Sequence, residues 1–136
     1  MTTKRTKVGS TNTRRFSRPV IAAIDASGIL GIRAGTRSDH RFTGVWPIVV
    51  NGRVFARSWS LKPGGWYQTF QDDPVGTLQI GERQIAIRAR PVRGSRLLAA
   101  IEEAYAEKYA TPASKKYVRG FRTARRRETT TEFVPR

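Results

Sequence analysis

The feature that most constrains the fold is a pair of strand-like runs separated by two residues, Asn51-Gly52. The runs, Thr43 to Val50 and Arg53 to Ser58, are rich in β-branched and aromatic side chains, which fit pleated strands. An Asn-Gly pair suits a type I′ turn, because both central positions of that turn need a positive φ. The pattern therefore predicts a tight antiparallel hairpin.

Two-residue periodicity recurs elsewhere in the chain. Leu30, Ile32 and Ala34 alternate with smaller or polar residues, as on a half-buried strand. A second hairpin is expected at Val75 to Ile80 and Arg83 to Val92, and residues 129–134 alternate as a last strand. Strands of this number and spacing predict a small barrel or rolled antiparallel sheet.

Helical spacing separates these strands at several places. One helix is expected to begin after an N-cap at Ser95 and to end at Thr111-Pro112. The other predicted helices are shorter, at Val20 to Ala26, Trp66 to Asp72 and Ala113 to Gly120. The expected fold class is therefore mainly β with peripheral helices, in one domain.

The positive charge is concentrated at the two ends of the chain. The net charge is +16, and thirteen of the 26 basic residues lie in residues 1–18 and 115–127, which contain no acid. Residues 1–17 offer almost nothing to bury, so they are predicted to be a disordered basic arm before a domain at 18–136. Such a field favours anionic partners, including phosphorylated cofactors and nucleic acid, without choosing among them.

Composition also excludes several kinds of chemistry. There is no cysteine, so disulfides and thiolate catalysis are excluded and a cytoplasmic location is expected. The apolar runs are too short to cross a membrane, and no apolar signal region follows the basic start. His40, the one histidine, cannot form a zinc site without cysteines. Any catalysis would therefore depend on a bound cofactor.

Basic and hydroxyl side chains near the predicted hairpin are candidates to bind an anion. Arginine offers a planar fork of donors that matches phosphate, and hydroxyls add further hydrogen bonds. The candidates lie on a polar turn and at the end of the hairpin: Arg37, Ser38, Arg41, Arg57, Ser58 and Lys62. The alternative is that these side chains are solvated on the outside of strands.

Four aromatic residues lie within a short stretch, at Trp46, Trp59, Trp66 and Tyr67. Flat rings suit stacking on a tricyclic cofactor or a nucleobase, although such residues also serve in cores and dimer interfaces. Trp66 is the favoured candidate, because two glycines precede it and let the backbone approach a ligand closely.

Several segments resemble the deazaflavin-dependent nitroreductase type. They are residues 51–58 (NGRVFARS), 64–67 (GGWY), 74–81 (PVGTLQIG) and 88–92 (RARPV), with residues 35–38, Arg41 and residues 46–48 upstream. That type belongs to the flavin-binding split β-barrel class, alongside pyridoxamine phosphate oxidase-like proteins. Over residues 18–136 the chain is similar to a small uncharacterised bacterial family of the same class. One departure is Gln68-Thr69-Phe70, where the deazaflavin enzymes have an Asn-Leu pair.

The resemblance implies a split antiparallel β-barrel of about six strands and a homodimer with the ligand groove at its interface. It implies FMN or an F420-type deazaflavin as cofactor, with hydride passing to a small nitro, quinone or enone substrate. The cofactor-binding residues that it implies are Arg37, Ser38, Arg41, Trp46, Arg57, Ser58, Trp59, Lys62, Trp66 and Tyr67.

Two other functions remain open from the sequence. The basic arm and the run Arg125 to Arg127 could bind nucleic acid through its phosphates, without reading its sequence. The alternative for these runs is a solvated charge that aids solubility. The barrel could also have kept its fold and lost its cofactor, since a fold does not dictate a function.

Overall fold

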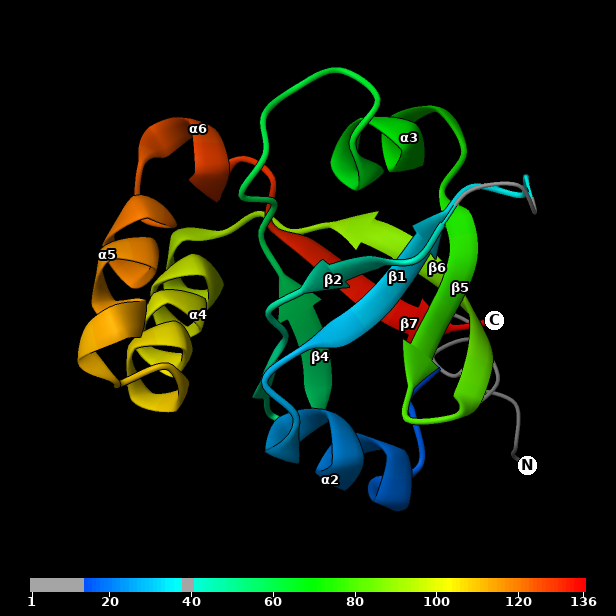
Figure 1. Cartoon of the computed structure of the whole chain (residues 1–136), viewed down its shortest axis with the longest axis horizontal. Coiled ribbons are helices and arrows are strands. Elements are labelled where there is room, and N and C mark those ends of the chain that lie inside the picture. The colour runs from blue at the N-terminus through cyan, green and yellow to red at the C-terminus, as the bar shows by residue number, and fades with distance from the viewer. Residues whose placement is uncertain (1–13, 38–40) are drawn as a thin grey trace, which may run out of the picture.

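A computed structural model of the chain describes residues 14–37 and 41–136, and their fold is built around one antiparallel sheet of seven strands (Figure 1). The strands are β1 (Leu30–Ala34), β2 (Thr43–Val45), β3 (Ile48–Val50), β4 (Arg53–Ala56), β5 (Val75–Ile80), β6 (Arg83–Pro91) and β7 (Thr131–Pro135). The helices are α2 (Arg18–Ala26), α3 (Trp66–Asp72), α4 (Ser95–Lys108), α5 (Pro112–Gly120) and α6 (Ala124–Arg127). No helix in these two ranges is long and apolar enough to span a membrane.

The sheet is curled into a half-barrel. Its strand order is β2-β1-β5-β6-β7-β4-β3, so the two edge strands are consecutive in sequence and only Trp46-Pro47 joins them. Two residues cannot cross a flat sheet of seven strands, and the sheet must therefore roll until its edges approach each other. The predicted class, a split barrel with peripheral helices, is confirmed.

The strand count differs from the prediction because the predicted strand at 43–50 divides. Proline has no N–H to donate to a ladder, so Pro47 ends the pairing of β2 with β1 and lets the chain turn into β3. The sheet consequently has seven strands rather than about six.

The Asn51-Gly52 hairpin forms as predicted. Val50 pairs with Arg53 across the turn, and both turn residues have positive φ, 52° at Asn51 and 73° at Gly52. Asn51 is the only residue other than glycine with a positive φ in residues 14–37 and 41–136. The turn therefore uses the two residue types that tolerate this conformation best.

Replacing Asn51 with alanine should lower the free energy of unfolding by about 1 kcal/mol, because a Cβ without a compensating polar group is strained at positive φ. Asn51→Gly is the matched control and should be near neutral, because glycine adopts this conformation freely. Urea denaturation of both variants checks the prediction, and equal stabilities would contradict it.

Two apolar clusters lie on opposite sides of β4. Val54 is fully buried and points into the barrel cluster with Leu78 and Phe133. The next residue, Phe55, points outward into a second cluster with Ile101 of α4 and Val118 of α5. The alternation of one strand thus fixes the barrel interior and docks the helical layer of α4 and α5.

The ordered domain begins earlier than residue 18. Phe16 is buried in the barrel cluster, and an Nη of Arg15 donates to the carbonyl of Asn51 at 2.8 Å. The Ser17 hydroxyl caps α2 by accepting from the backbone N–H of Val20. The end of the predicted arm is therefore part of the domain, because Phe16 has apolar surface to bury, and residues 1–13 lie outside the described residues.

The ends of the helices differ from the predictions: α2 begins at Arg18 rather than Val20, and the starts of α4 and α5 differ as well. Gly94, with a φ of 100°, occupies the N-cap of α4, and Ser95 is the first helical residue rather than the cap. Thr111 caps α5, accepting from the N–H of Ser114, so Pro112 starts this helix as well as ending the segment before it. Helix α6 was not predicted and is formed by the run Arg125 to Arg127 with Ala124.

Candidate functional site

The candidate site is a groove between the β1–β2 hairpin and the loop that leads from β4 to α3. We call it the barrel groove, and its volume is about 280 Å³. Arg41 and Trp59 line it, together with Trp66 at the start of α3. Its other lining residues are Ile32, Ala34, Thr43, Gly44, Ser58, Ser60, Gly64, Gly65 and Thr69. Four predicted site residues therefore meet here: Arg41, Ser58, Trp59 and Trp66.

Trp66 is held in the wall of the groove by the barrel core. Its side chain is mostly buried, and its ring lies 6.0 Å from that of Phe70 and 5.8 Å from that of Phe133. The preceding Gly64 has a φ of 85°, a conformation that glycine adopts without strain. This bare stretch of backbone leaves the groove open beside the Trp66 ring.

Trp59 also lines the groove and is 42% exposed. Its ring rests on α5 at Gly120, where an added Cβ would lie 2.5 Å from two ring atoms. The guanidinium of Arg126 lies 4.0 Å from the ring centroid, and its Nε donates to the Trp59 carbonyl at 2.9 Å. The cation–π contact and the hydrogen bond hold this exposed tryptophan in place.

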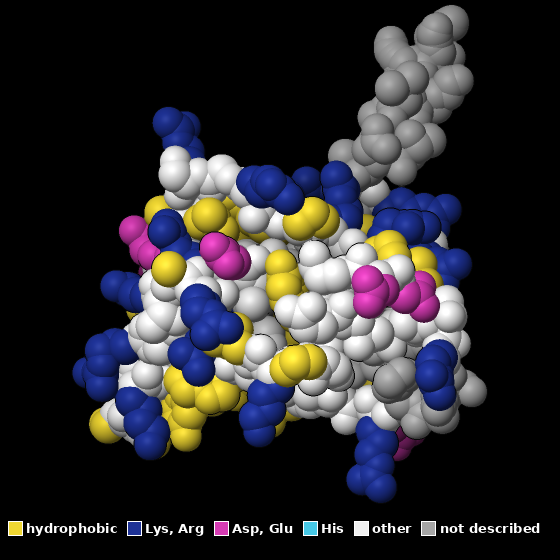
Figure 2. Space-filling model, turned by 90° about the horizontal axis from the view of Figure 1, so that it is seen from above, with side chains coloured by type: hydrophobic (Ala, Val, Ile, Leu, Met, Phe, Trp, Pro, Cys, Tyr) yellow, Lys and Arg dark blue, Asp and Glu magenta, His cyan; other side chains and the backbone are white. Residues whose placement is uncertain are grey.

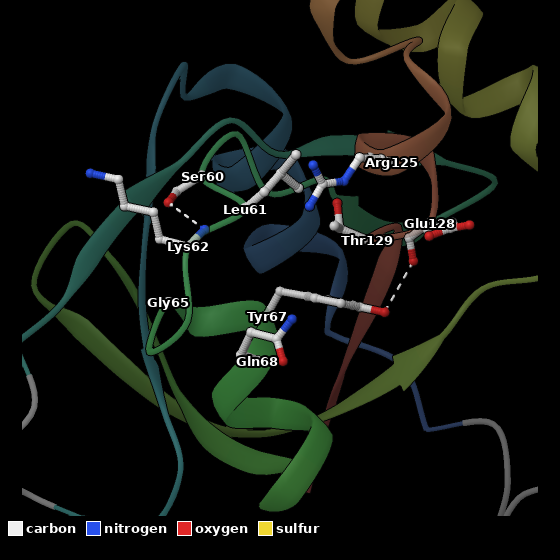
Figure 3. Close-up of a pocket in the computed structure, with 9 residues that line it drawn as sticks. All are labelled: Ser60, Leu61, Lys62, Gly65, Tyr67, Gln68, Arg125, Glu128 and Thr129. Carbon is white, nitrogen blue, oxygen red and sulfur yellow. Dashed lines mark hydrogen bonds between the residues drawn. The ribbon is translucent and has the colours of Figure 1, made fainter.

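A smaller polar cavity adjoins the barrel groove, and the two share Ser60 and Gly65 (Figure 3). This polar cavity, about 120 Å³, is lined by Ser60, Leu61, Lys62, Gly65, Tyr67, Gln68, Arg125, Glu128 and Thr129. In Figure 3 the side chains of Lys62 and Arg125 come from opposite sides, and the Lys62 ammonium points outward. The hydroxyl of Tyr67 donates to the carbonyl of Glu128 at 3.1 Å. Two of the predicted site residues, Lys62 and Tyr67, are therefore found here.

Arg57 corrects the prediction, because its guanidinium already has partners inside the protein. The residue is 1% exposed, and its Nε donates to the Thr130 hydroxyl at 2.7 Å. Its Nη1 donates to the carbonyl of Phe121 at 2.9 Å and to Glu102 at 3.3 Å. Burial lowers the pKa of Arg57, and the charge of Glu102 opposes that change. Arg57 therefore joins β4 to the helical layer and is left out of the proposed phosphate site.

Of the other predicted residues, Trp46 and Arg37 lie outside both cavities, and Ser58 lines the barrel groove in a structural role. Trp46 stacks on Tyr109 with ring centroids 4.5 Å apart and does not line the barrel groove. Arg37 is exposed beyond the end of β1 and lines neither cavity, and Ser38 lies outside the described residues. Ser58 is buried, and its hydroxyl donates to the carbonyl of Ser60 at 2.6 Å, so it shapes the loop that forms the groove.

The arginine run of α6 is tied into the domain rather than being a free basic patch. Arg125 lines the polar cavity, Arg126 lies over Trp59, and Arg127 forms an ion pair with Glu102. Figure 2 looks onto the end of the barrel that carries α3 and α6, and Lys and Arg side chains lie around much of this face. Binding of nucleic acid by the basic ends remains a prediction.

Sequence reasoning missed the contribution of Arg125 to the site, because the run 125–127 looked uniform in the sequence. It also missed Gly44, whose bare backbone lies in the groove wall. No local signal marks either residue, since both reach the site through long-range packing. Among the described residues, no group of acidic or histidine side chains could hold a metal ion.

Comparison with known proteins places the chain in a family. The model of a bacterial family described as "Uncharacterized protein conserved in bacteria (DUF2255)" matches residues 20–133. The chain belongs to the DUF2255 family. The expected membership of a bacterial family in the split-barrel class is therefore confirmed. A search of curated proteins gives no match to this DUF2255 chain.

Solved structures with the same fold include two described proteins. The crystal structure of the conserved hypothetical protein Rv2991 from Mycobacterium tuberculosis has a TM-score of 0.59 at 15% identity, over 91% of this chain and 86% of that one. An F420-H2 dependent reductase (FDR-A) has a TM-score of 0.54 at 18% identity, over 79% and 93%. A domain-swapped dimer has a TM-score of 0.52 at 18% identity, over 79% and 78%. At these identities the likeness shows the split-barrel fold alone.

Proposed function

We propose that this protein binds an F420-type deazaflavin, or FMN, in the barrel groove and reduces small oxidised molecules with it. The observation that carries the proposal is the meeting of Arg41, Trp59 and Trp66 at one groove with glycine backbone in its wall. The F420-H2 dependent reductase with the same fold supports a deazaflavin as the first cofactor to test.

The residues of the groove fit such a cofactor in two parts. Tryptophan rings and glycine backbone suit a flat ring system, because they offer apolar surface without crowding it. A cofactor of this kind also carries a phosphate, and the adjoining polar cavity offers the guanidinium of Arg125, with the flexible side chain of Lys62 at its rim (Figure 3). The two cavities share Ser60 and Gly65, so one ligand can extend through both.

A bound cofactor of this type would supply hydride transfer to a nitro, quinone or enone group. The protein's own side chains have simpler tasks. Trp59 and Trp66 cover apolar ring surface and exclude water, while Lys62 and Arg125 neutralise the phosphate and orient the ligand. No acidic or histidine side chain lies among the described residues of the barrel groove.

A homodimer is part of the proposal. The barrel groove is open on one side, and a domain-swapped dimer is among the structures of the same fold. A second subunit over the open side would complete the walls around the cofactor. Size-exclusion chromatography with light scattering tests this separately from cofactor binding.

Fluorescence titration of the purified protein with F420 and with FMN tests cofactor binding. Arg125→Ala should weaken binding about five- to tenfold, which is roughly 1–1.4 kcal/mol, because it removes a charge at the cavity that would hold the phosphate, and Lys62→Ala should weaken it less, because the Lys62 ammonium points outward and must turn to reach the ligand (Figure 3). Lys115→Ala is the matched control, since this exposed lysine of α5 lines neither the groove nor the polar cavity. Binding of neither cofactor at about 50 µM protein, a dissociation free energy of only about 6 kcal/mol, would refute the proposal.

A further inference from the structure

A second pocket opens beside the barrel groove, between β2 and α5. We call it the aromatic pocket, and its volume is about 180 Å³. Five aromatic side chains line it: Trp46, Trp59, Trp66, Tyr117 and Phe121. It shares Gly44, Trp59 and Trp66 with the barrel groove, so a ligand in one lies next to a ligand in the other. All three tryptophans of the chain therefore meet at this pocket.

The rings form a wall with defined geometry. Trp59 meets Tyr117 edge to face at 5.1 Å and Phe121 at 5.5 Å. Trp46 meets Tyr117 edge to face at 5.6 Å, and its other contact, the stack on Tyr109, fixes its orientation. A cavity of about 150 Å³ lined by apolar side chains is enough to hold benzene, so this open pocket accommodates a ligand of one or two rings.

The charge around the pocket is positive. Among its described lining residues the one charged side chain is Arg57, and none is acidic. Arg57 and Arg127 both contact the same carboxylate, that of Glu102, so one positive charge of this trio is not compensated. Arg126 adds another, 4.0 Å from the centroid of the Trp59 ring. Aromatic faces attract cations, but the positive charge around this pocket repels them, and the pocket therefore disfavours a cation.

We infer that the aromatic pocket binds a planar aromatic anion, such as an aryl carboxylate. The rings cover its flat faces, and the positive charge around the pocket attracts its carboxylate, with Arg126 beside Trp59 as the more exposed arginine. The binding site stands on its own geometry, whereas the role of the ligand as substrate rests on the proposed function. As a substrate, it would lie beside the cofactor ring through the shared wall of Trp59 and Trp66.

Calorimetric titration of the cofactor-free protein with three matched probes tests the charge preference. The probes are 2-naphthoate, 2-naphthylmethanol and (2-naphthylmethyl)trimethylammonium, which share the ring and differ in charge. Naphthoate should bind at least about fivefold more tightly than the alcohol, and the cation most weakly. The three tryptophan indole N–H signals in NMR spectra should all shift with naphthoate. Equal affinity for the three probes, or no binding at about 1 mM, would overturn the inference.

Variants locate the site. Gly120→Ala should weaken naphthoate binding at least about fivefold, because the new methyl group displaces the Trp59 ring. Gly28→Ala adds the same methyl group where no atom lies within 4 Å, and it should leave binding unchanged. Tyr117→Ala removes one of the aromatic rings that line the pocket and should also weaken naphthoate binding. It provides an independent test if Gly120→Ala does not fold. Arg126→Gln should reduce the affinity for naphthoate toward that for the alcohol.

The outcomes separate this inference from the proposed function. Naphthoate binding without binding of F420 or FMN would refute the cofactor proposal and keep the aromatic pocket. Cofactor binding together with unchanged naphthoate affinity in Gly120→Ala and Tyr117→Ala would support the cofactor proposal and refute the aromatic pocket. Displacement of naphthoate by saturating cofactor would also overturn the inference, because the pocket would then belong to the cofactor ring.

Discussion

Replacing Arg57 with leucine should lower the free energy of unfolding by about 3–5 kcal/mol, the cost typical of removing one partner from a buried ion pair. The leucine would fill part of the space but would leave the hydroxyl of Thr130 and the carbonyl of Phe121 without their donor. Glu102 would lose one of its two guanidinium partners. Urea denaturation at pH 7 measures the change.

Arg88→Leu provides the matched control for this variant. Arg88 lies on the exposed outer face of β6, and its replacement should change the free energy of unfolding by less than about 0.5 kcal/mol. A loss below about 1 kcal/mol in Arg57→Leu would contradict the buried network, because it would mean that water replaces the lost hydrogen bonds. A loss of stability of the expected size would support the structural role of Arg57 if the cofactor affinity is unchanged at low temperature, where the variant remains folded.

The local features of the fold could be predicted from the sequence. The Asn51-Gly52 turn and the alternation in β1 and β6 are read from neighbouring residues, and the structure has them where they were expected. The order of the strands could not be predicted in the same way. It depends on pairings such as β4 with β7, in which Val54 lies opposite Phe133, and no local pattern encodes a partner that distant.

The candidate site could likewise be predicted in part, where neighbouring residues indicate it. Trp59 and Trp66 flank the Gly-Gly loop in sequence, and the fold brings them to one groove with Arg41. Arg57 looked similar to the other basic residues, yet its contacts are with Glu102 and Thr130, which are 45 and 73 positions away. A single sequence gives the charge of a side chain but not the direction in which it points. The role of Arg57 could not be predicted, because it depends on where α4 packs.

Two buried tyrosines, Tyr105 in α4 and Tyr109 at the C-cap of this helix, connect the stability of the fold to pH. The hydroxyl of Tyr105 accepts from the backbone N–H of Arg57 at 2.9 Å and donates to the carbonyl of Trp46 at 2.7 Å. The hydroxyl of Tyr109 donates to the carbonyl of Pro47 at 2.8 Å. Burial raises the pKa of both tyrosines well above the ordinary value of about 10, because a phenolate would lose its hydration there.

The raised pKa of these tyrosines should make the fold less stable in alkali, because the unfolded chain releases their protons at a lower pH than the folded chain. Above pH 10 the unfolded chain releases these two protons while the folded chain keeps them, so stability is complete below pH 10 and is lost as the pH rises toward the folded values. Lys108 has the opposite effect on stability, because partial burial lowers its pKa. Most of this gain in stability has occurred by about pH 10.5, the pKa of lysine in the unfolded chain, so it changes the slope little above that pH. Between pH 10.5 and 11.5 the free energy of unfolding should therefore fall by about 2.4 kcal/mol, roughly 1.2 for each tyrosine.

Urea denaturation across this range measures the slope, and phenylalanine variants show its origin. Tyr105→Phe and Tyr109→Phe should each be less stable at pH 8, because each loses a buried hydrogen bond. Each should nevertheless lose only about half as much stability between pH 10.5 and 11.5, since one proton fewer is released on unfolding. The double variant should be nearly independent of pH in this window. If the stability of the double variant falls as steeply with pH as that of the wild type, other groups cause the alkaline transition. The two phenols would then be less buried than their packing against β3 and α5 indicates.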